Sequence, residues 1–264
     1  MRKSLWIIPV LLLFAAGGVP VAHADSLGIT YYTIAANDPD ANNLAHGVFN
    51  NEVQSALGPD GLPVLNTAQF GCISGCYAEL GAPGNVVPSG PGAGEITYWD
   101  PKLNPYVTNT GTSTVTLPFD VPSNFFPNNG TGKCDGPYPC LGYQAAVLSG
   151  NLIVPAHTSE TISFNIGADD MAFAYLNGQV VCDLGGVHAS TAGTCITAII
   201  TTGATAESIP LEVFFVDINQ VQSGLIFGVN TEGITTTATP EPGTLSLLGL
   251  GLAGLGFVKR RMLS

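Results

Sequence analysis

Apolar and polar side chains alternate over short segments of this chain, and turn-forming residues separate these segments. In Thr161 to Gly167 every second residue is apolar, which is typical of a strand that is buried on one face. The apolar residues are Ile162, Phe164 and Ile166. Further strands are predicted by the short apolar runs Val115 to Phe119, Leu211 to Val216 and Leu225 to Val229.

A β-hairpin is the most definite local prediction. Ala172 to Leu176 and Gln179 to Leu184 are two strand-like runs joined by the dipeptide Asn177-Gly178. Asn-Gly tolerates the positive φ angles of a two-residue hairpin turn better than most other dipeptides. We therefore expect the two runs to pair antiparallel.

One segment favours a helix instead. Within Ala45 to Leu57 the apolar residues recur at intervals of three to five, so that they fall roughly on one helical face. These residues are Val48, Phe49, Val53, Ala56 and Leu57.

The composition agrees with a fold made of strands and turns. The chain of 264 residues has 33 glycines and 19 prolines, and only 10% of its residues are charged. Long amphipathic helices need fewer breakers and more charge on the solvent side. The sequence predicts one all-β domain over residues 25–234, an antiparallel β-sandwich, followed by a linker over 235–239.

The N-terminal residues resemble a secretory signal peptide. Arg2-Lys3 precedes an apolar run from Leu5 to Ala16, and Ala22-His23-Ala24 supplies the small residues of a cleavage site. We expect residues 1–24 to be removed, which leaves Asp25 as the first residue of the exported protein.

The C-terminal residues 240–264 have three parts in a fixed order. Pro240-Glu241-Pro242 comes first, an apolar span 243–258 follows, and Lys259-Arg260-Arg261 ends the pattern. A helix of 16 residues is roughly 24 Å long, short for a hydrocarbon core of ~30 Å, and the basic residues mark the cytoplasmic side.

This order closely resembles the PEP-CTERM sorting signal of Gram-negative bacteria that make extracellular polysaccharide. The resemblance implies recognition near Pro240-Glu241-Pro242 by an exosortase. The enzyme would remove the tail and pass the rest of the protein from the inner membrane to the cell surface or the extracellular matrix. An ordinary tail anchor is the alternative interpretation.

Processing at both ends would leave a strongly acidic protein. Residues 25–239 contain 18 acidic side chains and only two basic ones, Lys102 and Lys133, which leaves 16 net negative charges. Such a surface repels nucleic acid and anionic lipid and attracts cations. Nucleic-acid binding is therefore not expected.

The six cysteines are expected to form disulfides, because their number is even and the chain is exported. Fifteen pairings are possible. Short spacings favour the three local bridges Cys72–Cys76, Cys134–Cys140 and Cys182–Cys195. A zinc site is the weaker alternative, because the sequence has no CxxC pair and no histidines at finger spacing.

Residues 168–188 carry a second resemblance. They run from Asp169-Asp170 through the Asn177-Gly178 turn to Asp183-Leu184-Gly185-Gly186-Val187-His188. This block resembles the core motif of fibro-slime domains, which are bacterial and slime-mould surface modules. Flanking blocks at 48–66, 117–132 and 211–230 follow the same order, although the plainer Gln144 to Ile166 and the Asp217-Ile218 pair depart from the family pattern.

Fibro-slime domains are in turn similar to the lectin-like β-sandwich of anthrax protective antigen. In its sugar-binding members two consecutive aspartates, often joined by a cis peptide, coordinate Ca²⁺ together with an Asn or Asp that follows a later strand. The resemblance implies Ca²⁺ ligands at Asp169, Asp170 and Asp217, with the Asn219 and Val221 carbonyls as further donors. Carboxylates and loop carbonyls are the hard oxygen ligands that Ca²⁺ takes. Without the resemblance, a turn that leads into a strand is the favoured reading of the aspartate pair, and the motif context reverses this preference.

Asn177, Asp183 and His188 are the candidates for the ligand-binding rim. The alternative is structural: Gly185-Gly186 permits a tight turn, and His188 bonds to loop backbone groups.

These features favour a non-catalytic surface protein that binds glycan or exopolysaccharide. An extracellular glycoside-acting enzyme is the alternative and would need two carboxylates facing a cleft. A structural matrix protein without a ligand is the third reading. No nucleophile elbow, HExxH motif, phosphate loop or dinucleotide fingerprint is present in the sequence.

Overall fold

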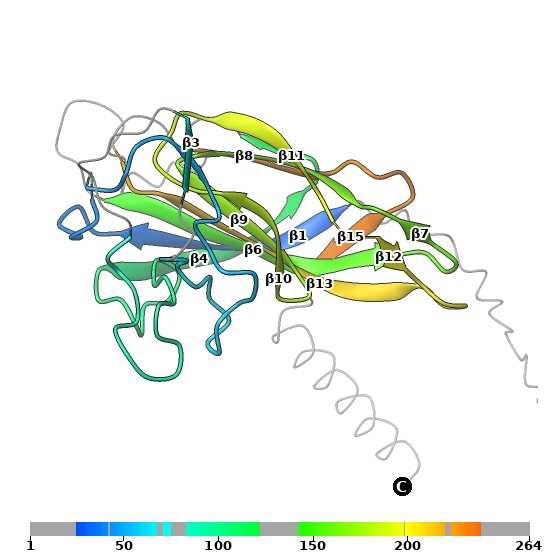
Figure 1. The fold of residues 1–264 in the computed structure, drawn as a ribbon, viewed down its shortest axis with the longest axis horizontal. Helices are drawn as coiled ribbons and strands as arrows, with labels where there is room; N and C mark the ends of the chain where they lie inside the picture. The colour runs from blue at the N-terminus through cyan, green and yellow to red at the C-terminus, as the bar shows by residue number, and fades with distance from the viewer. Residues whose placement is uncertain are drawn as a thin grey trace, which may run out of the picture.

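A large antiparallel sheet crosses the molecule and carries most of its long strands (Figure 1). The computed structural model describes residues 25–41, 43–67, 71–74, 83–121, 142–197, 199–219 and 223–238. In the large sheet the strand order is β10-β9-β13-β6-β1-β4, and β15 pairs with the far part of β6. The bounds are β1 Ser26–Ile34, β4 Val107–Thr116, β6 Tyr143–Val154, β9 Met171–Leu176, β10 Gln179–Leu184, β13 Glu207–Asp217 and β15 Thr235–Ala238.

A second antiparallel sheet packs against one face of the first. Its order is β11-β8-β14-β5. The bounds are β5 Phe119–Val121, β8 Ser163–Asp169, β11 Thr191–Ile196 and β14 Gly224–Val229. Two short ribbons complete the described strands: β2 Val48–Asn50 with β3 Gly71–Ser74, and β7 Ser159–Glu160 with β12 Ile200–Thr201. The predicted all-β antiparallel sandwich is confirmed.

The main hydrophobic core lies between the two sheets. Phe164 of β8 stacks on Phe227 of β14 with ring centroids 5.9 Å apart. Both rings pack in one buried cluster with Leu148 and Phe215 of the large sheet. The predicted alternation in β8 is therefore confirmed, because Ile162, Phe164 and Ile166 are all buried.

A second core covers part of the other face of the large sheet. The described residues between 35 and 106 are mostly irregular, and Trp99 from this part of the chain is buried in one cluster with Phe214 and Tyr175. The Trp99 indole N–H also donates to the Phe215 carbonyl oxygen at 2.7 Å. Since β9 is covered on both faces, all six of its residues are buried and its sequence is apolar almost throughout.

The predicted hairpin is confirmed by β9 and β10. Leu176 pairs with Gln179, and Asn177 and Gly178 have φ angles of 51° and 71°, as a two-residue turn of this kind requires. The strands predicted at 211–216 and 225–229 are β13 and β14. The run predicted over 115–119 is divided, because β4 ends at Thr116 in one sheet and β5 begins at Phe119 in the other.

The predicted helix over residues 45–57 is wrong. This segment instead runs along β10, the edge strand of the large sheet, with bridges such as Phe49 to Gly185 and Ala56 to Gln179. An edge strand leaves a row of backbone N–H and C=O groups without partners, and the segment supplies them. Phe49 and Val53 are still buried. The apolar residues of this segment therefore pack into the protein although the segment is not a helix.

Residues 235–238 were expected to be part of a linker, but they form β15. Thr236 is fully buried, and its backbone N–H donates to the Asp25 carboxylate at 2.8 Å. Asp25, the first residue that the structure describes, therefore lies beside β15, the last described strand. The described residues contain no helix that is long and apolar enough to span a membrane, and the predicted span 243–258 lies outside them.

A disulfide joins Cys182 of β10 to Cys195 of β11 and so links the two sheets, which confirms one of the three predicted bridges. The side chains of Cys72, Cys76, Cys134 and Cys140 lie outside the described part of the chain, and their pairing stays a prediction.

Replacing Cys182 and Cys195 together by Ala should lower the free energy of unfolding by about 2–3 kcal/mol. The bridge closes a loop of 13 residues, whose freedom in the unfolded chain it restricts. Urea denaturation followed by circular dichroism measures the change, with the exposed Thr194→Ala as a control in the same strand. An unchanged midpoint in the double variant would contradict this role.

Candidate functional site

Three aspartates meet at the loop-rich end of the sandwich. Asp169 ends β8, Asp170 immediately precedes β9, and Asp217 ends β13. Because Val216 of β13 pairs with Met171 of β9, the end of one strand lies beside the start of the other. The predicted placement of the three aspartates at one end is therefore borne out by the topology.

Backbone N–H groups hold these carboxylates in place. Ile218 N donates to Asp170 Oδ2 at 2.9 Å, and Asn219 N donates to Asp217 Oδ1 at 3.2 Å. Ser190 N donates to Asp169 Oδ2 at 3.3 Å. The peptide bond between Asp169 and Asp170 is cis, as the resemblance to the lectin-like domains implies.

The three carboxylates are buried close to one another. Asp169, Asp170 and Asp217 are 6%, 2% and 4% exposed. Burial raises the pKa of Asp170 well above its usual range, and the neighbouring charge of Asp169 raises it further. Hydrogen bonds from the Ile218 N–H and from the Asp217 carboxyl act in the opposite direction. The site thus holds negative charge at a cost in desolvation, and a cation would offset that cost.

Asp169 and Asp170 open onto a pocket of about 240 Å³, below the ~300 Å³ at which drug-sized ligand sites begin. It is lined by His46, Asp169, Asp170, Val187, His188, Ala189 and Asn219. No lysine or arginine is among these residues, and Asp217 is not one of them.

Two histidines face this pocket from different parts of the chain. His46 Nε2 lies 3.4 Å from the Asn219 side-chain amide. His188 Nδ1 lies 3.0 Å from the Ala189 carbonyl oxygen, and its Nε2 is buried without a hydrogen-bond partner. Burial lowers the pKa of His188, so the ring is neutral near pH 7 and presents an uncharged nitrogen at the pocket.

The described residues contain no group of three or more His, Cys, Asp or Glu side chains arranged to hold a metal ion. A cation in this pocket would therefore take two carboxylates, those of Asp169 and Asp170, and complete its shell with the Asn219 oxygen and other ligands. The predicted ligand set of Asp169, Asp170, Asp217 and Asn219 stays a prediction, and Val221 lies outside the described residues.

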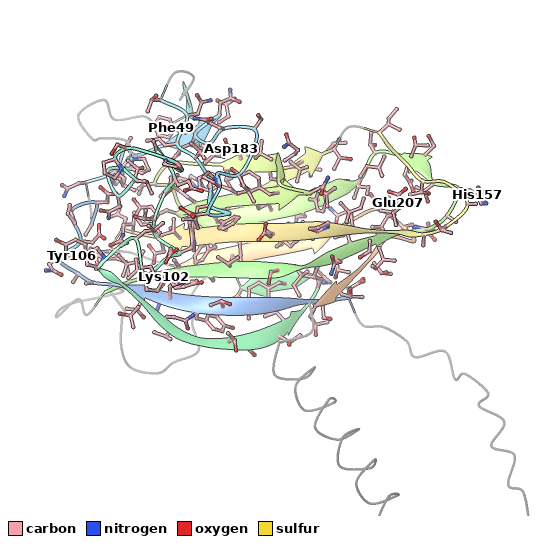
Figure 2. All side chains as sticks on the ribbon, turned by 90° about the horizontal axis from the view of Figure 1, so that it is seen from below. Phe49, Lys102, Tyr106, His157, Asp183 and Glu207 are labelled. Carbon is pink, nitrogen blue, oxygen red and sulfur yellow. A yellow bond between two sulfur atoms is a disulfide. The ribbon has the colours of Figure 1, made fainter. Side chains whose placement is uncertain are left out.

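The candidate rim residues are not brought together. His188 lines the pocket, but Asp183 lies in a separate pocket of about 360 Å³, which is lined by Asn51, Val53, Gln54, Ser55, Asn66, Val180 and Asp183. Asn177 lies in the exposed β9–β10 turn, about 23 Å from Asp170 at ~3.3 Å per strand residue. Figure 2 shows Asp183 and Phe49 near each other at the end of the molecule opposite His157.

Sequence reasoning missed two residues that contribute to these pockets. His46 reaches the first pocket because residues 45–57 follow the edge of β10. Glu52 lies in the same segment, is 1% exposed, and is a neighbour of Asp183, which lines the second pocket. Neither residue belongs to a motif with known spacing, and the helix predicted for this segment would have separated them from β10.

The Gly185-Gly186 pair has two distinct structural roles. Gly186 has a φ angle of 80°, which favours glycine. At Gly185 a Cβ would overlap the Glu52 carboxylate, so only glycine lets that side chain approach the strand. The predicted tight-turn role therefore fits Gly186, whereas Gly185 makes room for Glu52.

Comparison with known proteins identifies the tail. Residues 238–261 match the family model described as the PEP-CTERM protein-sorting motif. This match confirms the predicted sorting motif and indicates a protein that is exported across a membrane. No curated protein matches the chain.

Several solved structures are similar to the folded domain at low identity. The PA14 sugar-binding domain from an RTX adhesin has 15% identity and a TM-score of 0.33, with 81% of this chain and 96% of that chain covered. The PA14 domain of MpAFP antifreeze protein has 16% identity and a TM-score of 0.27, with coverage of 38% and 55%. The GH31 α-xylosidase from Xanthomonas citri has 10% identity and a TM-score of 0.33, with coverage of 49% and 14%. This chain thus spans about half of the antifreeze domain and a seventh of the xylosidase, and likenesses this weak do not establish what it binds.

Replacing Gly185 by Ala should destabilise the fold by roughly 1–3 kcal/mol, because the added methyl group displaces the buried Glu52 side chain. Gly193→Ala is the matched control, since a Cβ there meets no atom within 4 Å. Thermal unfolding of both variants measures the difference. Equal melting temperatures for the two variants would show that Glu52 does not occupy this space.

Proposed function

We propose that this chain is an exported, non-catalytic protein that binds glycan or exopolysaccharide at the Asp169-Asp170 pocket, with Ca²⁺ as cofactor. Its place of action is the cell surface or the extracellular matrix of a Gram-negative bacterium. An exosortase-type enzyme is its processing partner, and the inner membrane holds the precursor transiently.

The observation that carries this proposal is the buried acid group at the pocket. Asp169 and Asp170 are adjacent in the chain, and the Asp217 carboxyl hydrogen-bonds to Asp170. No lysine or arginine is among the described residues that line the pocket. Buried charges are normally paired or bound to a metal ion. Since the donors are oxygens and the site is anionic, a hard divalent cation such as Ca²⁺ suits it best.

The residues have separate roles in this proposal. Asp169 and Asp170 hold the ion from the pocket wall, and Asn219 adds a neutral oxygen. Asp217 does not line the pocket, but its carboxyl hydrogen-bonds to Asp170 and keeps that carboxyl oriented. A bound Ca²⁺ would supply positive charge and open coordination positions for sugar hydroxyl oxygens, and the unpartnered His188 Nε2 is placed to accept a hydrogen bond from such a ligand.

The placement of the pocket and of β15 along β6 supports a surface role. Asp25 and β15 lie at the far part of β6, beside Leu152, whereas Asp217 pairs with Gln144 near its start. The eight residues between Gln144 and Leu152 span about 26 Å at ~3.3 Å each. Asp217, beside the pocket, and β15 therefore lie toward opposite ends of β6.

A catalytic role is less well supported by the geometry. A glycoside-acting enzyme needs two carboxyl groups on opposite sides of a cleft, about 5–9.5 Å apart. Asp169 and Asp170 are consecutive residues, and they are the only carboxylates among the described residues that line this small pocket. We therefore propose binding without turnover.

Calcium should raise the melting temperature of the purified protein. At a concentration 100 times Kd, an ion that binds only the folded state adds about 2.7 kcal/mol, which corresponds to roughly 5–10 °C for a domain of this size. Replacing Asp169 and Asp170 by Asn should remove the part of this increment due to the pocket, and sugar binding with it, because the neutral amides no longer attract the ion.

The control for this experiment is Asp120→Asn, an exposed aspartate in β5 that is far from the pocket in sequence. It should keep the full calcium response and the glycan binding measured on an array. If the double Asn variant keeps both, the pocket is not the binding site.

Replacing Glu241 by Ala should leave an uncleaved precursor in the membrane, because the sorting motif loses its central residue. Immunoblotting of membrane and extracellular fractions separates the two sizes. Release of the variant at the size of the normal protein would be inconsistent with exosortase recognition, and Glu232→Ala is a matched control outside the motif.

A further inference from the structure

A second pair of acidic side chains meets at the edge of the large sheet, apart from the Asp169-Asp170 pocket. Glu52 follows β2, and Asp183 lies in β10. They come together because Phe49 and Gly185 exchange two backbone hydrogen bonds, of 2.9 and 3.0 Å. The pairing of the two acids thus follows from the way residues 46–56 cover β10.

The glycine at position 185 fixes where the Glu52 carboxylate lies. Residues 183 and 185 point to the same side of the strand, since side chains alternate along it. A Cβ at Gly185 would overlap Glu52 Oε2, so that oxygen occupies the place of the missing side chain. Glu52 is therefore the neighbour of Asp183 on one face of β10.

Backbone N–H groups donate to each of the two carboxyl groups but leave one oxygen of each without a partner. Asp183 Oδ2 accepts from the Val53 N–H at 3.0 Å, and the Glu52 backbone N–H also donates to the Asp183 carboxyl. The Gly186 N–H donates to the Glu52 carboxyl. Glu52 Oε2 and Asp183 Oδ1 are buried and have no hydrogen-bond partner. Two buried acceptors without donors are costly unless a positively charged group lies between them.

Asp183 of this pair opens onto a pocket, whereas Glu52 is buried and is not among the residues that line it. Asp183 lines the 360 Å³ pocket together with Asn51, Gln54, Ser55 and Asn66. These side chains carry amide and hydroxyl oxygens and no positive charge. They are the neutral oxygen donors that complete a calcium shell beside carboxylates.

We propose that Glu52 Oε2 and Asp183 Oδ1 form a second cation site, which binds Ca²⁺ and fastens residues 46–56 to the edge of β10. All the donors are hard oxygens, and neither histidine nor cysteine is among the residues that line the pocket, so Zn²⁺ and softer metals are disfavoured. The two carboxylates balance the charge of one divalent ion. The site uses no residue of the Asp169-Asp170 pocket and does not depend on glycan binding.

The site also bears on the first pocket. His46, which lines that pocket and contacts Asn219, belongs to the segment that Glu52 fastens. An ion at Glu52 and Asp183 therefore restrains one wall of the first pocket through six residues of chain.

Isothermal titration of metal-free protein with CaCl₂ tests the proposal. The Asp169→Asn, Asp170→Asn protein should still bind one Ca²⁺ per chain, and the addition of Glu52→Gln to it should abolish this binding. Asp183→Asn in the same background should do the same. Asp60→Asn is the control for loss of an exposed carboxylate and should leave binding unchanged.

Folding is checked separately with the metal removed. In EDTA, Glu52→Gln should melt at or above the temperature of the unsubstituted protein, because a neutral amide replaces a buried carboxyl in the same space. With Ca²⁺ the order should reverse, since only the protein with Glu52 gains from the ion.

Two results would overturn the proposal. The first is a double Asn protein that binds no Ca²⁺ although wild type binds one ion, which would assign all binding to the first pocket. The second is retention of calcium binding after Glu52→Gln. A pair that only shares a proton would give no calcium heat in the double Asn background, together with a melting temperature that falls as the pH rises, and this also contradicts the proposal.

Discussion

Buried carboxylates set the main electrostatic constraint on this fold, because the exported part of the chain offers only two lysines to pair with 18 acidic side chains. Some of these carboxylates are satisfied by the protein itself. Asp40 accepts the Tyr98 hydroxyl at 2.6 Å and the N–H groups of Gly84 and Asn85, and so ties two loops together. Others keep oxygens without donors, and a proton or a metal ion must then compensate the charge.

Two of the carboxylates with an unpartnered oxygen, Glu52 and Asp183, meet where residues 45–57 cover the edge strand β10. Burial raises the pKa of Glu52 to about 8, with the Asp183 charge as a further cause, and burial raises the pKa of Asp183 to about 6. These directions mean that both acids resist ionisation in the metal-free protein. A bound cation would instead favour the ionised form of both carboxyl groups. Ion binding would then be linked to the position of residues 46–56 and to the shape of the first pocket.

The elements that can be predicted from the sequence are those that depend on residues close together in the chain. The β9–β10 hairpin depends on Asn177-Gly178, and β8 depends on a period-two pattern over a few residues, so both are readable without the rest of the chain. The Cys182–Cys195 bridge is also local, since 13 residues separate the two cysteines. The aspartates 169, 170 and 217 reach one end because each adjoins a predicted strand end.

The remaining features depend on distant parts of the chain. The helical spacing of residues 45–57 gives no hint that β10 needs backbone partners, and Glu52 meets Asp183 only across that pairing. The threonine-rich residues 235–238 look like a linker, because a strand added beside β6 requires no apolar run of its own. The long strands β1 and β6 also lack a clear alternating signal, since β6 is covered on both faces over part of its length.

Native mass spectrometry of the purified protein in calcium-containing buffer would test the central claim directly, because it counts the ions bound to each folded chain. If buried carboxylates are compensated by metal at both acid sites, the spectrum will show two Ca²⁺ per chain, and these will be lost when the protein is denatured. A folded chain that carries no calcium under these conditions would contradict the account and would leave protons as the compensating charge.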